Sequence, residues 1–162
     1  MHIHLIFAMA EFAIPTLPCM CATLRRTTRA LTQLYEEALR PFGLRATQFT
    51  ILQALSLTGE VTQGDLGRIL AMDSTTLTRT LEIMSRQRWT TKRRGKDRRE
   101  WRLRMAKAGK AQFERAVPVW QQVQDKVKRE MGADRSDQLA KLANHLTKAI
   151  TTKEVRHEEE AV

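Results

Sequence analysis

The fold is decided by residues 62–79, which read TQGDLGRILAMDSTTLTR. Thr62 can cap a short helix whose apolar side chains recur at helical spacing. A few residues later, Asp73 or Ser74 can cap a second helix, with Leu77 on its inner face. Two short helices joined by a tight connection, the second rich in Ser and Thr, predict a helix-turn-helix.

A basic β-hairpin is expected directly after these two helices. Residues 89–93 are typical of a strand, and residues 95–97, Gly-Lys-Asp, of a turn. Trp101 and Leu103 then alternate with arginines, which indicates a half-buried second strand. A hairpin in this place extends the prediction to a winged helix-turn-helix.

Two helices are expected before this unit. Leucine spacing predicts the first over residues 21–42, and Pro41 and Gly43 would end it. Thr47 is the expected N-cap of the second helix, which Gly59 would close.

Two more helices are expected after the hairpin. The first would run over residues 107–131, with Pro118 as a kink inside it and Gly132 as its end. Asp134 or Ser136 would begin the last helix, whose acidic tail is expected to fray. The predicted fold class is therefore mainly α with a small β-hairpin wing.

The positive charge of the chain is concentrated in one segment. The net charge is +10, and residues 79–110 hold 13 Lys and Arg against three Asp and Glu. The remaining chain holds 15 of each sign, so the whole excess lies in this window. A concentrated basic patch favours a polyanionic partner, whereas a merely solvated face would mix both signs. The window lacks the broad apolar face of an interfacial helix, which favours nucleic acid over a membrane surface.

Several function classes find little support. Two cysteines are too few for a disulfide framework, so a cytoplasmic protein is expected. No apolar run is long enough to span a membrane, and no catalytic or phosphate-loop motif is present. No enzyme activity, cofactor or metal site is predicted. His2 and His4, with Cys19 and Cys21, are zinc-ligand types, but nothing brings the two pairs together.

The start of the Ser/Thr-rich helix carries the candidate contacts to bases. Short hydroxyl side chains allow the backbone to approach the major groove and can bond phosphates or base edges. The alternative is that Ser74 and Thr75 serve only as helix caps. The residues expected to face DNA are Ser74, Thr75, Thr76, Thr78 and Arg79.

The tip of the hairpin carries a second set of candidates. Arginines suit the enhanced negative potential of a narrow minor groove. Asp97 is expected to hold Arg99 in a bidentate pair, or alternatively to favour the turn. The candidate contacts at this tip are Arg93, Arg94, Lys96, Asp97, Arg98 and Arg99.

From about residue 21 to residue 150, the ordered set of motifs resembles the MarR (multiple antibiotic resistance regulator) family. The matching pieces are Arg25-Arg26 to Arg29-Ala30, Leu44-Arg45-Ala46-Thr47-Gln48-Phe49, Asp73-Ser74-Thr75-Thr76-Leu77-Thr78-Arg79, and Asp97-Arg98-Arg99. After the wing, residues 105–109 stand where the family has Leu-Thr-x-x-Gly, so the capping Thr is missing.

The resemblance implies a transcriptional regulator, in particular a repressor, that binds a pseudo-palindromic operator in double-stranded DNA as a homodimer. Residues 46–106 would form the DNA-binding region, and residues 19–45 and 107–152 the dimerisation region. Residues 1–18 would be an arm, either disordered or packed in the dimer. An RNA-binding or membrane-surface-binding basic protein is the alternative from another class.

The resemblance also suggests two kinds of effector. Cys21 matches a first-helix cysteine that is oxidised in the organic-hydroperoxide repressors of the family, and Tyr35 matches their cysteine-bonding tyrosine. Cys19 would allow a bridge between subunits. The alternative is that Cys21 is only a small apolar residue in an interface. Other members bind small aromatic acids, for which Phe49 and Trp120 could line a cleft, although core packing suits both.

Overall fold

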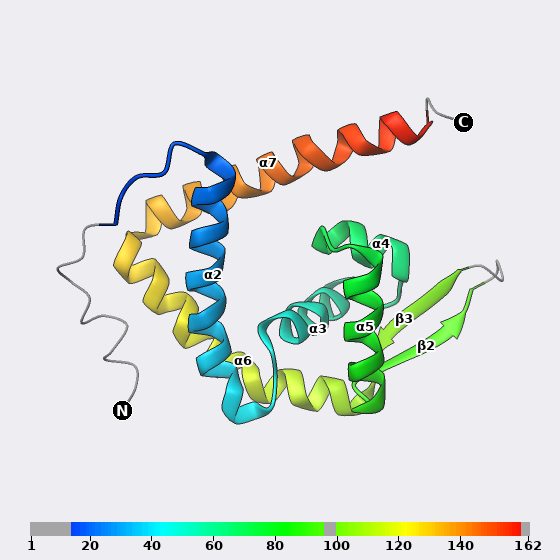
Figure 1. The fold of residues 1–162 in the computed structure, drawn as a ribbon. Helices are drawn as coiled ribbons and strands as arrows, with labels where there is room; N and C mark the ends of the chain where they lie inside the picture. Colours follow the sequence, from blue (N-terminus) through cyan, green and yellow to red (C-terminus); the bar gives the residue numbers. More distant parts are fainter. Residues whose placement is uncertain (1–13, 96–99, 160–162) are drawn as a thin grey trace. The chain divides into compact units, whose positions relative to one another are not determined.

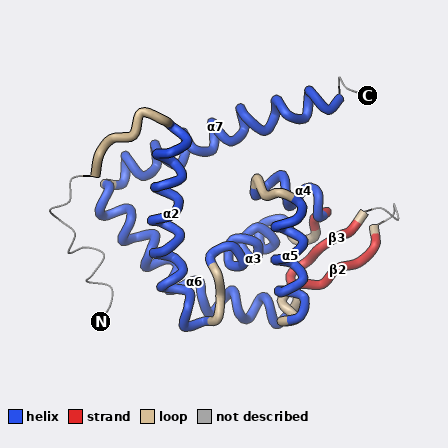
Figure 2. Tube along the Cα trace, viewed as in Figure 1, coloured by secondary structure: helices blue, strands red, loops and turns tan. Residues whose placement is uncertain are grey.

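The computed structural model describes residues 14–95 and 100–159, and side chains up to Thr151. The helices and strands appear in Figure 1 and, coloured by type, in Figure 2. They are α2 (Met20–Leu39), the 3-10 helix η1 (Arg40–Phe42), α3 (Ala46–Thr58), β1 (Val61–Thr62), α4 (Gln63–Leu70), α5 (Ser74–Arg86), β2 (Thr90–Arg94), β3 (Trp101–Met105), α6 (Lys107–Met131) and α7 (Ala133–Glu159). The predicted fold class, mainly α with a small wing, is confirmed.

The chain divides within α2 into two compact units, residues 1–33 and residues 34–162. In the first, the segment before α2 is bonded to the first turns of that helix. Thr23 Oγ1 donates to Leu17 O at 3.4 Å, and Arg26 Nη1 donates to Pro15 O at 2.9 Å. The second unit holds the sheet, the helix-turn-helix and the long C-terminal helices.

A three-stranded antiparallel sheet lies in the second unit, in the order β1-β3-β2. Five residue pairs, from Thr90 with Met105 to Arg94 with Trp101, join β2 to β3 in the expected hairpin. The strand β1 was not predicted, because two residues are too few for a visible alternation pattern. It pairs Val61 with Leu103, which ties the connection between α3 and α4 to the wing.

The helix caps agree with the sequence in two places. Thr62 accepts from the backbone N–H of Asp65 at 3.0 Å, and Asp73 accepts from that of Thr76 at 2.9 Å. The expected cap at Thr47 is wrong, because α3 already begins at Ala46. Instead, one carboxamide and one carboxylate side chain accept hydrogen bonds from the backbone N–H groups at the start of α3. Gln48 Oε1 accepts from Arg45 N at 2.9 Å, and Glu36 Oε1 accepts from Ala46 N at 2.8 Å.

The ends of three other helices also differ from the expectation. The first helix changes to a 3-10 turn over its last three expected residues, Arg40–Phe42. The last helix begins at Ala133 rather than at Asp134 or Ser136, directly after Gly132 at φ +82°. Its backbone stays helical to Glu159, whereas fraying was expected. In α6, Pro118 lies inside a continuous helix, which changes direction along its length in Figure 1.

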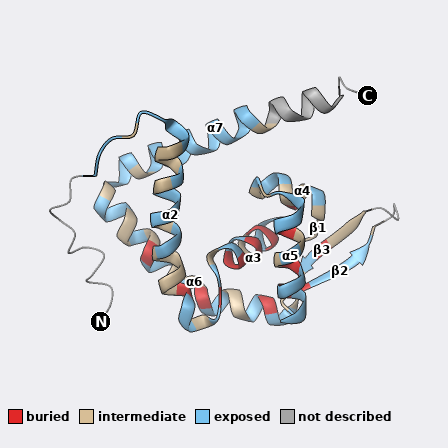
Figure 3. Ribbon diagram, in the orientation of Figure 1, coloured by how far each residue is buried: buried red, intermediate tan, exposed pale blue. Residues whose placement is uncertain are grey.

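The core lies around α3. Figure 3 shows buried positions gathered on α3 and on the faces of α5 and α6. Phe49 is 2% exposed, and its ring lies 5.1 Å from that of Phe113 and 5.7 Å from that of Trp120. Phe49 and Trp120 therefore pack in the core. This was the simpler of the two roles expected for them, the other being to line a ligand cleft. The largest fully buried side chains are Leu39, Leu44, Ile51, Leu52, Leu55, Leu66, Leu77, Met84 and Leu103.

Candidate nucleic-acid interface

Helix α5 is anchored by one face and exposed on the other. Leu77, Leu81 and Met84 are 1%, 5% and 0% exposed, and their spacing of four and three residues places them on one side. Ser74, Thr75, Thr76 and Arg79 are exposed on the remaining surface. The N-terminal turn of α5 therefore presents hydroxyl groups and one guanidinium to solvent.

Thr78 differs from the other predicted contacts on α5. It is half-buried, and its hydroxyl accepts a hydrogen bond from Gln63 Nε2 at 2.8 Å. Gln63 is the first residue of α4, so this bond joins the two helices of the helix-turn-helix. Thr78 thus helps to position α5, a role that the sequence did not indicate.

The Asp73 cap makes helix α5 sensitive to acid. Hydrogen bonds from the side chain and then the backbone N–H of Thr76 lower the pKa of Asp73 below its ordinary value of 3.8. A lowered pKa means that the cap stabilises the fold above pH 3.8 and is lost as the pH falls through the folded-state pKa. We expect the loss of unfolding free energy in Asp73→Ala to be constant at neutral pH and to shrink below about pH 4.

Urea unfolding at pH 7, 5 and 3.5 would measure this dependence. Asp73→Asn is the matched control, since its amide oxygen can cap the helix without titrating. An Asp73→Ala difference that does not change with pH would contradict the proposed cap.

Strand alternation divides the cations of the wing between two faces. In the register of β2 and β3, Arg94 lies opposite Trp101, and Arg93 lies opposite Arg102. Successive side chains of a strand point to opposite sides. Lys92 and Arg94 therefore share the face of Trp101, while Arg93 and Arg102 share the other face.

Trp101 is a platform for the two cations on its face. Lys92 Nζ lies 4.3 Å from the centre of the indole, and the guanidinium carbon of Arg94 lies 4.0 Å from it. Contacts of this length are cation–π interactions, which hold a cation without neutralising its charge. Both cations remain exposed at the outer part of the wing.

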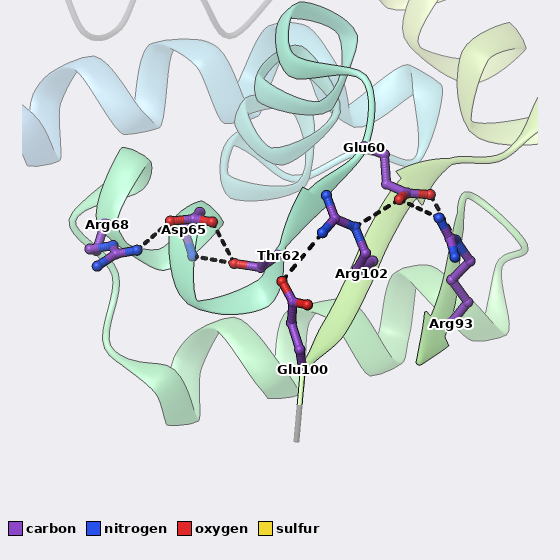
Figure 4. Close-up of polar contacts among 7 residues, drawn as sticks. All are labelled: Glu60, Thr62, Asp65, Arg68, Arg93, Glu100 and Arg102. Atoms are coloured by element: carbon purple, nitrogen blue, oxygen red, sulfur yellow. Dashed lines mark hydrogen bonds and ion pairs between the residues drawn. The ribbon is translucent and has the colours of Figure 1, made fainter. Parts of the chain in front are cut away.

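Glu60 holds the two arginines on the opposite face. It lies in the two-residue connection between α3 and β1, and Figure 4 shows its carboxylate between Arg93 and Arg102. Glu60 Oε1 accepts from Arg93 Nη2 at 2.7 Å and from Arg102 Nε at 2.8 Å, and Glu60 Oε2 accepts from Arg93 Nε at 2.9 Å. The hydrogen bond from Arg93, followed by that from Arg102, lowers the pKa of Glu60.

A second carboxylate extends this group. Arg102 Nη1 donates to Glu100 Oε1 at 3.3 Å, and the backbone of Glu100 accepts from Gly95 N at 2.9 Å. The remaining contacts drawn in Figure 4 belong to the cap of α4, where Asp65 accepts from Thr62 Oγ1 at 2.7 Å and is also paired with Arg68. Part of the basic excess of residues 79–110 is therefore paired with acids.

The other predicted site residues fall into three groups. Lys96, Asp97, Arg98 and Arg99, with the expected Asp97–Arg99 pair, lie outside the described residues. Cys19 and Cys21 are free thiols at exposed positions of the single chain. Tyr35 is half-buried, and burial raises the pKa of its phenol. His2 and His4 also lie outside the described residues.

Within the described residues, none of the helices has both the length and the apolar character needed to cross a membrane. The same residues contain no group of three or more His, Cys, Asp or Glu side chains placed to hold a metal ion.

Comparison with known proteins identifies the family. A family model described as MarR family matches residues 42–100. The uncharacterised HTH-type transcriptional regulator YwoH of Bacillus subtilis is 29% identical over 91 residues, which cover 56% of this chain and 66% of YwoH, just under two thirds of its length.

Two solved structures extend the match over most of the chain. The transcriptional regulator MosR of M. tuberculosis, crystallised in complex with DNA, is 36% identical, with a TM-score of 0.75 over 83% of this chain and 97% of MosR. A MarR variant from E. coli, crystallised with operator DNA, has the same fold at 21% identity, with a TM-score of 0.71 over 78% of this chain and 92% of the variant. The chain therefore belongs to the MarR family of winged helix-turn-helix transcriptional regulators, as its sequence motifs predicted.

Proposed function

We propose that this protein binds double-stranded DNA through helix α5 and the wing, and regulates transcription in this way. The observation that carries the proposal is the exposed, cap-stabilised start of α5, which presents Ser74, Thr75, Thr76 and Arg79. A helix N-terminus with short polar side chains suits the major groove, because its amides and hydroxyls can reach phosphates and base edges. The DNA complex of MosR, a relative at 36% identity, supports the same use of this fold.

The wing would enter the neighbouring minor groove. Lys92 and Arg94, on the Trp101 platform, extend toward its outer end. Cations there meet the strong negative potential of a narrow groove. The residues at the tip of the wing would complete this surface: Lys96, Asp97, Arg98 and Arg99. Arg99 would enter the groove, and Asp97 would orient the Arg99 side chain.

The protein would act as a homodimer on a pseudo-palindromic operator. Residues 46–106 would bind DNA, and residues 19–45 and 107–152 would form the dimer. The support for a dimer is an apolar stripe on α7, at intervals of three and four residues, that remains exposed in the single chain. The stripe consists of Leu139, Leu142, Leu146 and Ile150. A two-fold dimer would place its recognition helices on half-sites about 10 base pairs apart.

The dimer interface is testable by one substitution. Leu142 is 67% exposed in the single chain, so a charge there should cost little if the chain stays a monomer. We expect Leu142→Lys to shift the protein toward the monomer by a factor of about ten or more, and to weaken operator binding, because a buried unpaired charge is costly. Light scattering after gel filtration would measure the shift. Ala140→Lys, exposed and away from the stripe, is the control, and equal masses for the two variants would contradict the interface.

In this proposal, one of two kinds of signal would release the protein from its operator. An exposed Cys21 thiol is accessible to hydroperoxides, and Cys19 is equally exposed. A small aromatic effector is the second signal that members of the family suggest. Operator binding should be compared before and after hydroperoxide treatment, in the native protein and in Cys21→Ser. A loss of binding that persists in Cys21→Ser would exclude this thiol as the sensor.

The decisive test of the main proposal is a competition assay. A duplex from the protein's own promoter region would be competed with duplex RNA and with anionic lipid vesicles at fixed salt. We expect the protein to bind the DNA duplex far more tightly than the RNA duplex or the vesicles. Genomic footprinting should then identify paired half-sites beside the regulated genes. In this proposal the protein acts in the cytoplasm. Equal affinity for RNA or for vesicles would favour the alternative of a general polyanion-binding protein.

A further inference from the structure

Glu60 lies in an unexpected place for an acid. It contacts both strands of the wing, in the most basic part of the chain, and DNA phosphates would repel its carboxylate. Its partners lie 33 and 42 residues away in the sequence, and the carboxylate makes three charge-assisted bonds to them. These bonds pair positive charge that would otherwise be available to DNA phosphates.

The position of Glu60 is set by the backbone on both sides. Gly59 ends α3 at φ +72°, a conformation that favours glycine, and Val61 pairs with Leu103 in the sheet. The carboxylate is thereby held beside β3 and β2, with its side chain 27% exposed. The Arg93 side chain remains 63% exposed, and its ion pair with Glu60 directs the guanidinium toward that carboxylate.

We propose that Glu60 limits the electrostatic part of the affinity for DNA, because it holds Arg93 and Arg102 away from phosphates. The inference rests on the proposed DNA binding. An unrestrained arginine contributes equally to every sequence, because phosphate contacts carry no sequence information. By pairing with these cations, Glu60 removes one positive charge per protomer from the DNA-facing surface, which lowers the affinity for operator and for random-sequence duplex by similar factors.

The salt dependence of binding tests this role. The slope of log Kobs against log salt concentration changes by about 0.9 for each phosphate that a protein neutralises. In Glu60→Gln, Arg102 keeps its ion pair with Glu100, so one arginine per protomer, Arg93, is released and the slope for a dimer should become steeper by about 2. Affinity for random-sequence duplex and for the operator should each rise on the order of tenfold at 0.1 M salt, and the ratio of the two should stay near that of the native protein.

Two further variants separate this role from others. Glu114→Gln, exposed on α6, removes the same charge away from the wing and should leave the slope unchanged. Adding Arg93→Gln to Glu60→Gln should return the slope toward that of the native protein.

Thermal unfolding completes the comparison. A lowered Tm in Glu60→Gln with the native salt slope would overturn the inference, because Glu60 would then serve only the fold. If the native protein binds no duplex DNA in a salt-dependent way, the proposed function fails, and this inference fails with it.

Discussion

Gly109→Ala is expected to lower the free energy of unfolding by about 2–3 kcal/mol and Tm by roughly 5–12 °C. Gly109 is buried in the first turn of α6, beside the backbone of Trp89. A Cβ atom there would lie 2.8 Å from the carbonyl carbon and 3.0 Å from Cα of Trp89, and nearer still to the carbonyl oxygen. Backbone cannot move aside as a flexible side chain does, so α6 and the start of β2 must separate.

The sign of this effect makes the test informative. An alanine inside a helix is otherwise favoured over glycine by about 1 kcal/mol. The Trp89 carbonyl also accepts from Ala106 N at 2.9 Å, which is the bond that orients α6 against the wing, since Ala106 has no capping side chain. Thermal and urea unfolding would measure the loss. Gly64→Ala is the control, because its Cβ would meet only Thr62 Oγ1 at 3.9 Å, and an equal loss in both would refute the close approach.

Arg79→Ala is expected to weaken operator binding by at least about 30-fold without a change in stability. Arg79 is exposed on the same helix whose Leu77 and Leu81 are anchored in the core. A base-specific arginine contributes about 1–3 kcal/mol, and a dimer loses two of them at once. Each 1.4 kcal/mol corresponds to a factor of ten in Kd.

Fluorescence anisotropy at fixed salt would measure the loss. Arg129→Ala, which removes an exposed charge near the end of α6, is the matched control and should change Kd far less. If both variants weaken binding equally, Arg79 contributes only general charge and α5 does not read the sequence.

The helix-turn-helix could be predicted because its signals are local. Thr62 caps α4 through a residue three positions away, and Asp73 caps α5 in the same manner. The buried face of α5 follows from helical spacing alone. The wing strands were predicted for the same reason, from a turn and from the alternation of Trp101 and Leu103 with arginines.

The remaining features depend on contacts between distant parts of the chain. The cap of α3 uses Glu36, ten residues before Ala46, and this made the local signal at Thr47 misleading. The pairing of β1 with β3 and the ion pairs of Glu60 join segments about 30 to 40 residues apart. A single acid outside the basic window has no local pattern that would reveal its partners.

The environment of Trp101 has a practical consequence for measuring the wing on its own. Of the three tryptophans, Trp89 and Trp120 pack against the core, whereas Trp101 lies in contact with Lys92 and Arg94. A phosphate that draws either cation from the indole ring would alter its electronic surroundings. Emission from a protein in which the two core tryptophans are replaced by phenylalanine would therefore act as an intrinsic optical probe of groove entry, with no attached dye.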